Sequence, residues 1–472
     1  MTFLSKRLAA AVSATALILL EAGCAVGPTY HAPTEAPVAL TPLDPRLATD
    51  QAAQADWWRS FGDPELNDLI QRGLAANLDV RIALDRVKGA RALFNERQLD
   101  LAPHVTTDGA YTRSREQVPG FTASPVDIEQ AQLGFDAAWE VDLFGRVRHQ
   151  VEAARADAQA ARDDLSQAQI EVVAEIARNY IDLRGAQARE AVAEQNAKTA
   201  ADTVHLTEVR GQIGTGDPVD TESARARLDA TQAAIPVLRA QEAQDAHRLA
   251  VLIGQRPGAL DDELDRPAPA GLTAPTAVAI GDAGAFLRNR PDVRAAERRL
   301  AAQTALTGEA TAELFPRVSV TGFVGFLSGD VGALFKSSGQ AWSVSPAVSW
   351  PGLDIGGALA RLRAQKAAGD ESLAAYQQTV LRAVEDLQDA LVTYRQRQQE
   401  VVSLSQQAEA SRRAADLAHI RYKEGRIDFL RVLDAERTRL EAEDALTQAQ
   451  TDANIDVVSI YKALGGEVPQ KG

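Results

Sequence analysis

Two hydrophobic patterns alternate along this chain, and each of them occurs twice. Short segments place apolar side chains at every second residue: between positions 318 and 326, the residues at 318, 320, 324 and 326 are apolar, whereas Ser319 and Thr321 are polar. Alternation over roughly ten residues, with aromatic side chains near the ends, is typical of a strand in a membrane barrel. The pattern predicts strands at about 104–118, 130–140, 316–328 and 340–350.

A very long helical stretch follows each pair of strands. The stretch 146–210 contains no proline and only one interior glycine, Gly185, and at about 1.5 Å per residue it would extend roughly 100 Å. In the second half, apolar residues recur seven apart at Leu373, Val380, Leu387 and Tyr394, which is the spacing of a coiled coil. We expect antiparallel helical hairpins at about 146–254 and 356–464.

A glycine-containing turn closes each hairpin. The first turn contains Gly214, Thr215 and Gly216, and the second contains Gly425 and Arg426. Glycine suits these positions because it reaches positive φ at low cost, which a helix reversal requires. A plain turn with no further role is the alternative interpretation.

The two halves of the chain share one plan. Asp79 recurs as Asp292 and Pro103 as Pro316, each 213 positions later, and the Asp142 motif recurs around Asp354. Matches in the same order at a nearly constant offset indicate a duplicated unit. We expect a signal peptide at 1–23, a lipid-anchored extended segment at 24–61, a first repeat at 62–280 and a second repeat at 281–466.

The N-terminus has the layout of a secretory signal. Lys6 and Arg7 precede an apolar run from Leu8 to Leu20, and small residues lead to Cys24, the only cysteine in the chain. This run is too short for a spanning helix, and the lone thiol has no disulfide partner. The arrangement resembles a bacterial lipoprotein cleavage site with lipid attached to Cys24, although Glu21 stands where an apolar residue is usual. A soluble periplasmic protein cut elsewhere is the alternative.

Composition excludes several classes of function. A net charge of −15 argues against a nucleic-acid partner, because neutralising phosphates requires clustered Lys and Arg. The six histidines show no metal-ligand spacing, and no nucleophile elbow or phosphate loop occurs. We therefore expect no enzyme activity, no metal and no cofactor apart from the covalent lipid.

Four strands cannot close a barrel by themselves. If they cross a membrane, their edges must pair with copies of the same chain, and three copies would supply twelve strands under cyclic symmetry. The expected fold class is mainly α with a β-barrel contribution and a long coiled-coil tunnel. A periplasmic coiled-coil scaffold lipoprotein without a pore, or a half-buried sheet in a soluble protein, are the alternatives.

These features together resemble the TolC/OprM outer-membrane factor family, specifically its lipoprotein branch. The resemblance covers about 24–466 and rests on the duplicated plan, the motif 139–145, the tip Gly425…Leu433-Asp434-Ala435 and the start Cys24–Tyr30 followed by Trp57-Trp58. It implies a homotrimer in the outer membrane that serves as a passive efflux duct, a periplasmic adaptor and an inner-membrane pump. The exported compound is not indicated.

The resemblance also implies a gate at the periplasmic helix tips. Asp434 matches the aspartate of the family's Leu-Asp-Ala motif, and Tyr422 matches a tyrosine on the preceding helix. Arg431 stands where some members carry a second aspartate. An ion pair between Arg431 and Asp434 is expected from their spacing of three residues, and a solvated helix face is the alternative. The turns at Gly214–Gly216 and Gly425–Arg426 would contact the adaptor.

Overall fold

The computed structural model describes residues 25–33, 48–49, 51, 55–117, 119–121, 123–265, 272, 277–281 and 283–466. The chain is mainly helical and forms two compact units, unit 1 (Met1–Thr34, Arg86–Arg162, Ala295–Gln378) and unit 2 (Glu35–Asp85, Asp163–Arg294, Thr379–Gly472). Each unit takes segments from both halves of the sequence. None of the helices in the described ranges is both long enough and apolar enough to span a bilayer.

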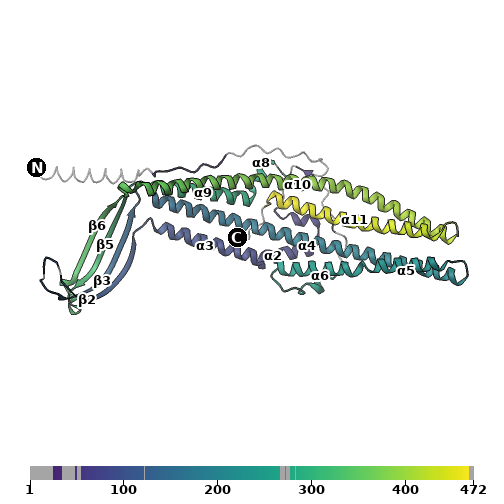
Figure 1. Ribbon diagram of the computed structural model, residues 1–472, viewed down its shortest axis with the longest axis horizontal. Helices are drawn as coiled ribbons and strands as arrows, with labels where there is room; N and C mark the ends of the chain where they lie inside the picture. Colours follow the sequence, from purple (N-terminus) through teal and green to yellow (C-terminus); the bar gives the residue numbers. More distant parts are fainter. Residues whose placement is uncertain are drawn as a thin grey trace. The chain divides into compact units, whose positions relative to one another are not determined.

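Ten α-helices have bounds in the described part of the chain (Figure 1). They are α2 Pro64–Ala76, α3 Leu78–Leu99, α4 Arg146–Gln212, α5 Pro218–Gln232, α6 Ile235–Leu252, α7 Asp261–Leu264, α8 Ala283–Asn289, α9 Pro291–Ala312, α10 Ile355–Lys423 and α11 Phe429–Leu464. The returning arm of the first hairpin is therefore two helices, with a break between Gln232 and Ile235. A proline in the first turn of α6 explains the break, because proline lacks the N–H that would continue α5.

Aromatic and aliphatic side chains fill the core of unit 2. Trp57 is buried and stacks on Tyr461 of α11 with ring centroids 5.0 Å apart, and the Tyr180 hydroxyl of α4 donates to Asp63 at 2.9 Å. The end of the N-terminal segment is thus not extended as expected. Residues Trp57–Phe61 form a short 3-10 helix, and both tryptophan side chains are buried within unit 2.

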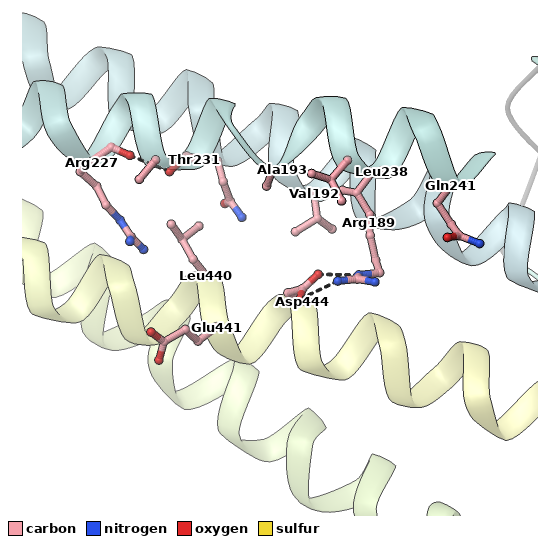
Figure 2. Close-up of a pocket in the computed structure, with 14 residues that line it drawn as sticks. Arg189, Val192, Ala193, Arg227, Thr231, Leu238, Gln241, Leu440, Glu441 and Asp444 are labelled. Carbon is pink, nitrogen blue, oxygen red and sulfur yellow. Dashed lines mark hydrogen bonds and ion pairs between the residues drawn. The ribbon is translucent and has the colours of Figure 1, made fainter. Parts of the chain in front are cut away.

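Small side chains let α4 and α11 approach closely within unit 2. A Cβ placed on Gly185 of α4 would lie 2.5 Å from the Thr451 hydroxyl and 3.0 Å from the Thr451 Cβ. Nearby, Arg189 of α4 donates to both carboxylate oxygens of Asp444 at 2.7 and 3.1 Å (Figure 2). The glycine therefore sets the separation of the two helices, and the ion pair joins them along their length.

Unit 1 contains a four-stranded antiparallel sheet (Figure 1). Its strands are β2 His104–Glu116, β3 Val126–Val141, β5 Arg317–Ser328 and β6 Gln340–Ser349, in the order β2-β3-β5-β6. Strand β3 begins four residues before the expected position 130. The two outer strands, β2 and β6, each pair on one side only within the described residues, which leaves two open edges.

The register gives the sheet one apolar and one polar face. Val105, Ala137, Gly322 and Val344 form a row across the four strands, and the next row places Thr106, Asp136, Phe323 and Ser343 on the opposite face. The apolar face is solvent-exposed in the single chain: Trp342 is 78% and Val344 63% exposed. Such an exposed apolar face requires another partner, since large apolar patches mark membrane or protein contacts.

Phe323 lies on the polar face for a local reason. Gly134 and Gly325 are register partners beside it, and a Cβ on Gly134 would lie 2.5 Å from the Phe323 ring. The ring therefore covers the backbone that two glycines leave bare. This packing explains why Phe323, a large aromatic residue, lies on the largely polar face.

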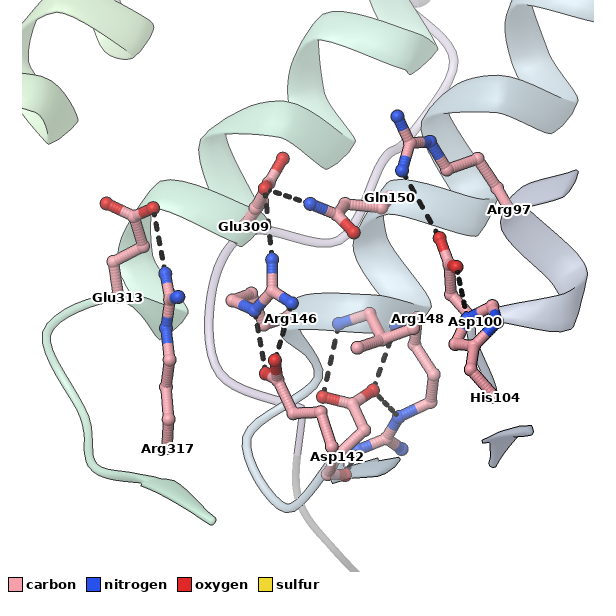
Figure 3. A network of polar contacts seen from close by, with 12 residues as sticks. Arg97, Asp100, His104, Asp142, Arg146, Arg148, Gln150, Glu309, Glu313 and Arg317 are labelled. Atoms are coloured by element: carbon pink, nitrogen blue, oxygen red, sulfur yellow. Dashed lines mark hydrogen bonds and ion pairs between the residues drawn. The ribbon is translucent and has the colours of Figure 1, made fainter. Parts of the chain in front are cut away.

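The motif at 139–145 joins the sheet to the helices of unit 1 (Figure 3). Asp142 accepts hydrogen bonds from the backbone N–H groups of Val147 and Arg148 at 3.2 and 2.9 Å, which caps the start of α4. Arg146 donates to both oxygens of Glu140 at 2.7 and 2.6 Å and lies 3.6 Å from Glu309 of α9. The motif therefore fixes the direction in which α4 leaves strand β3.

The same tryptophan contact is made in both repeats. The Trp139 indole N–H donates to the Leu101 carbonyl at 3.1 Å, and the Trp350 indole N–H donates to the Leu314 carbonyl at 3.1 Å. Leu314 lies 213 positions after Leu101, which is the offset of the repeat. Each bond connects the end of the second strand of a pair to the loop that leads from a helix into the first strand. The two strand pairs are therefore closed by the same contact.

Candidate functional site at the helix tips

The two hairpin turns in unit 2 are built alike. Gly214 and Gly425 have φ values of +78° and +71°, and no atom lies within 4 Å of a Cβ placed on either one. Backbone conformation, rather than lack of space, therefore requires glycine at these positions. Asp217 and Asp428 follow the turns and accept backbone hydrogen bonds from Val219 and Arg431, which starts α5 and α11.

The remaining tip residues lie close to the turns. The Thr215 and Gly216 N–H groups both donate to the Arg210 carbonyl at 2.9 Å, and the Arg426 N–H donates to the Arg421 carbonyl at 2.9 Å. The Arg426 side chain is exposed and pairs with Glu424 at 3.2 Å. The turn residues are thus accessible at the surface of unit 2 but have no enclosed site of their own.

Tyr422 connects the two hairpins at the tips. The residue is 3% exposed and packs with Phe429 at a ring-centroid distance of 5.3 Å. Its hydroxyl donates to Asp220 of α5 at 3.3 Å. Arg210 of α4 donates to the Tyr422 carbonyl at 2.8 Å, and its guanidinium lies 4.4 Å from the centre of the Tyr422 ring. We name Tyr422, Asp220 and Arg210 the tip latch.

Burial and neighbouring charges both shift the pKa values of Asp220 and Tyr422 in the tip latch. Burial raises the pKa of Asp220, whereas the hydrogen bond from Tyr422 and the nearby Arg210 charge oppose this rise. Burial also raises the pKa of Tyr422, and the Arg210 charge opposes that shift as well. The phenol therefore stays protonated at neutral pH and can act as the donor.

Asp434 and Arg431 lie outside the tip latch. The expected ion pair between them does not form; Asp434 pairs with Arg437 at 2.9 Å, and both side chains are exposed. Arg431 contributes its backbone N–H to the Asp428 cap. Because an aspartate with an arginine three residues away on both sides can pair with either, the spacing alone did not decide between Arg431 and Arg437.

Sequence reasoning missed Asp220 and Arg210. Asp220 does carry a signal, because it occupies the position of the first repeat that corresponds to Arg431 of the second. A second connection lies further from the tips: buried Glu436 of α11 contacts His419 of α10 at 2.6 Å and accepts from Thr203 of α4 at 3.0 Å. Nothing in the linear sequence pairs these three residues.

Cys24 lies outside the described residues, but the segment that follows it is held against unit 1. The Val26 N–H donates to the Phe144 carbonyl at 3.0 Å, and the Val26 carbonyl lies 3.0 Å from the His149 ring nitrogen. Tyr30 donates to Glu297 of α9. A Cβ on Gly27 would lie 2.7 Å from the Gly308 backbone, so the segment packs closely on helix α9.

Comparison with known proteins gives the family. The model for "Outer membrane efflux protein" matches residues 69–255 and again 284–466, once in each half of the chain. The antibiotic efflux pump outer membrane protein ArpC of Pseudomonas putida is 31% identical over 96% of this chain and 94% of its own. Outer membrane protein OprJ of Pseudomonas aeruginosa is 30% identical over 96% and 95%.

Solved structures agree with this result. The outer-membrane channel OprN superposes with a TM-score of 0.90 and 44% identity, covering 94% of this chain and 100% of its own. The Campylobacter jejuni CmeC outer membrane channel shares the fold, with a TM-score of 0.87 at 22% identity over 95% and 96% of the two chains. This chain therefore belongs to the outer membrane efflux protein family and is an outer-membrane channel subunit of an efflux system.

Proposed function

We propose that three copies of the chain form one passive duct through the outer membrane. The observation that carries this proposal is the sheet of unit 1, which has an exposed apolar face, a polar face and two open edges. Pairing β6 of one copy with β2 of the next would satisfy both edges and give a closed barrel of twelve strands. The apolar face would then contact lipid, and the polar face would line water.

The helical tips would form the periplasmic gate of this duct. The tip latch ties α10 to α5 and α4 within one chain, so its release is a way for the two hairpins to separate. Asp434, exposed on α11, would face the axis of the trimer, where three carboxylates favour cations. A periplasmic adaptor that binds better to separated tips, at Gly214–Gly216 and Gly425–Arg426, would shift the gate toward the open state.

The proposal also includes an adaptor and a pump as partners, a lipid anchor on Cys24, and a duct that catalyses no reaction. ArpC is named as an outer membrane protein of an efflux pump, and by analogy an inner-membrane pump would supply the energy through the adaptor. Lipid attached to Cys24 would hold the N-terminus at the membrane, with the segment at Val26 fixing where the lipid leaves the protein. The duct itself would need no catalytic residue and no cofactor.

The experiment compares two neighbouring positions on β6 that face opposite ways. Val344→Asp places a charge on the face proposed to contact lipid, where an acidic group is costly, whereas Ser345→Asp places it on the face proposed to line water. We expect Val344→Asp to reduce the yield of membrane-inserted trimer strongly. Ser345→Asp should insert and assemble like the unchanged protein. Light scattering of detergent-solubilised protein measures the trimer fraction, and planar bilayers measure conductance.

Equal assembly of the two variants would contradict the proposed orientation of the sheet. A helical dimer or a stable monomer in place of the trimer would contradict the duct. Non-conducting trimers would show a closed gate or a plugged lumen, and the Tyr422→Phe variant described below distinguishes these two outcomes.

A further inference from the structure

A groove in unit 2 has the composition of a small-molecule site. It encloses about 560 Å³ between α4, the junction of α5 with α6, and α11 (Figure 2). Its walls are largely apolar, formed by Val192, Val237, Leu238 and Leu440 together with three alanines, Ala193, Ala230 and Ala234. Ligand sites of this size are typically apolar with a few placed polar groups. We call it the α5–α11 groove.

The helix break produces the groove. Helix α5 ends at Gln232 and α6 begins at Ile235, so the chain changes course beside α11. Alanines line the groove at this point on both α4 and the α5–α6 junction, and their short side chains do not fill the space between the helices. The volume thus results from local sequence on three elements of a single unit.

The α5–α11 groove contains one arginine whose charge is balanced and one whose charge is not. Arg189 donates to Asp444 twice and to Gln448 at 2.9 Å. Arg227, which also lines the groove, has no carboxylate within ion-pair distance among the described residues, and its Nε is buried without a hydrogen-bond partner. Figure 2 shows its guanidinium projecting from α5 toward α11.

An unpaired, half-buried cation among apolar walls is unfavourable unless an anion reaches it. The acidic groups nearby are already engaged or turned to solvent: Asp444 pairs with Arg189, and Glu441 is exposed and makes no ion pair with Arg227. Guanidinium groups bind carboxylates and sulfonates through parallel N–H donors. The groove is therefore complementary to a molecule with one anionic group and an apolar body.

The position of the groove relates it to the proposed duct. Glu441 follows Asp434 by seven residues on α11, which is close to two helical turns, so both lie on the same face of the helix. Asp444 and Leu440, the other two residues of α11 that line the groove, lie roughly a quarter and a third of a turn away from that face. If Asp434 faces the axis of the trimer, the Glu441 edge of the groove borders the axis. This step rests on the proposed function, whereas the binding chemistry of the groove does not.

We propose that the α5–α11 groove binds small amphipathic organic anions, with the anionic group on Arg227 and the apolar body against Val237 and Leu238. The groove would be a contact point in the tunnel wall for solutes of this class. A carboxylate or sulfonate on a fused aromatic ring has the required charge, and its flat body fits between the alanine-lined helices.

The test uses full-length trimer and 2-naphthalenesulfonate as the probe, in equilibrium dialysis against protein-free micelles. The unchanged protein should bind the probe saturably. Arg227→Gln should weaken binding at least about tenfold, because it removes a charge-assisted contact, and Arg227→Lys should restore part of it. Arg225→Gln is the matched control: it removes the same charge two residues away, where Arg225 pairs with Glu208 and Glu222 at the surface.

Uncharged naphthalene-2-sulfonamide separates charge recognition from apolar partitioning. It should bind more weakly than the sulfonate, and equally to the unchanged protein and to Arg227→Gln. No saturable binding of the sulfonate, or equal losses in Arg225→Gln and Arg227→Gln, would overturn the proposal. If an acidic side chain of a neighbouring copy paired with Arg227 in the trimer, the probe would not bind. That result would also overturn the proposal.

Conductance separates this proposal from the duct. The conductance of each variant with the probe is compared with the conductance of the same trimer without it; only trimers that retain Arg227 should show a reduction on adding the probe. Binding by trimers that conduct neither as the unchanged protein nor with Tyr422→Phe would support the groove and reject the duct. Conduction that neither the probe nor the Arg227→Gln substitution changes would support the duct and reject the groove.

Discussion

Removing one oxygen atom from the tip latch tests the gate most directly. Tyr422→Phe keeps the ring that packs against Phe429 but deletes the hydroxyl that donates to Asp220 at 3.3 Å. A hydrogen bond of this kind contributes about 1 kcal/mol per chain. If the three chains of the proposed trimer open together, the sum of about 3 kcal/mol changes the closed-to-open ratio roughly 100-fold. If each chain opens alone, the change is only about fivefold.

Single-channel recording in planar bilayers measures this ratio as the fraction of time spent open at rest. We expect Tyr422→Phe to raise it, and the size of the increase to show whether the tips act together. Asp220→Ala should raise it by a similar factor. The double variant should add little to either single change, because both remove the same contact.

Arg431→Ala is the matched control for the latch. Its side chain makes no hydrogen bond or ion pair with another described residue, so the resting open fraction should not change. Asp434→Ala should reduce cation preference with little effect on opening. Unchanged opening in Tyr422→Phe and Asp220→Ala, with trimers intact, would refute the assignment of the gate to this contact.

Three further outcomes are expected. Gly185→Ala should lower the melting temperature of the trimer, measured by circular dichroism, because overpacking against Thr451 costs about 1–3 kcal/mol; Thr451→Ala should recover part of the loss, and no loss at all would contradict the close approach. Burial and the Glu190 charge raise the pKa of Glu242 to about 7 from 4.5, so the folded state favours the protonated form and its stability falls as pH rises from about 4.5 to 7. Glu242→Gln should therefore raise the melting temperature at pH 8 and change it little at pH 4, whereas equal shifts at both would argue against this cause. Cys24→Ser should remove acyl-chain mass from the mature protein in mass spectrometry without abolishing assembly; an unmodified Cys24 in the unchanged protein would exclude the anchor.

Local periodicity made the strands and long helices predictable. Side chains alternate on a strand whatever surrounds it, so Val344 and Ser345 could be assigned to opposite faces from the sequence alone. Heptad spacing likewise identified Leu387 and Tyr394, which are buried. The break before Ile235 was missed because an alanine-rich stretch continues a helical pattern, and only the proline after Ile235 marks the new helix.

Contacts between distant residues were the part that sequence could not supply. Tyr422 and Asp220 are 202 residues apart, and the repeat aligns the two hairpins in sequence without indicating which of their residues touch. Arg227 looked like any other charge on a helix face until the structure showed which neighbours it lacks. Pairing depends on three-dimensional register between helices, which a single sequence does not encode in any local signal.

The duplicated turns contain an electrostatic asymmetry. Asp217 and Asp428 start their helices in the same way, and Gly214 and Gly425 have nearly the same φ, yet three residues after each cap one arm carries Asp220 and the other Arg431. Backbone geometry is thus held constant while the sign of one charge is reversed. In a ring of three chains this position would be aspartate at three tips and arginine at the other three. Because Asp220 is hydrogen-bonded to Tyr422 whereas Arg431 is exposed, a partner that contacts all six tips would meet the charge of Arg431 more readily than that of Asp220.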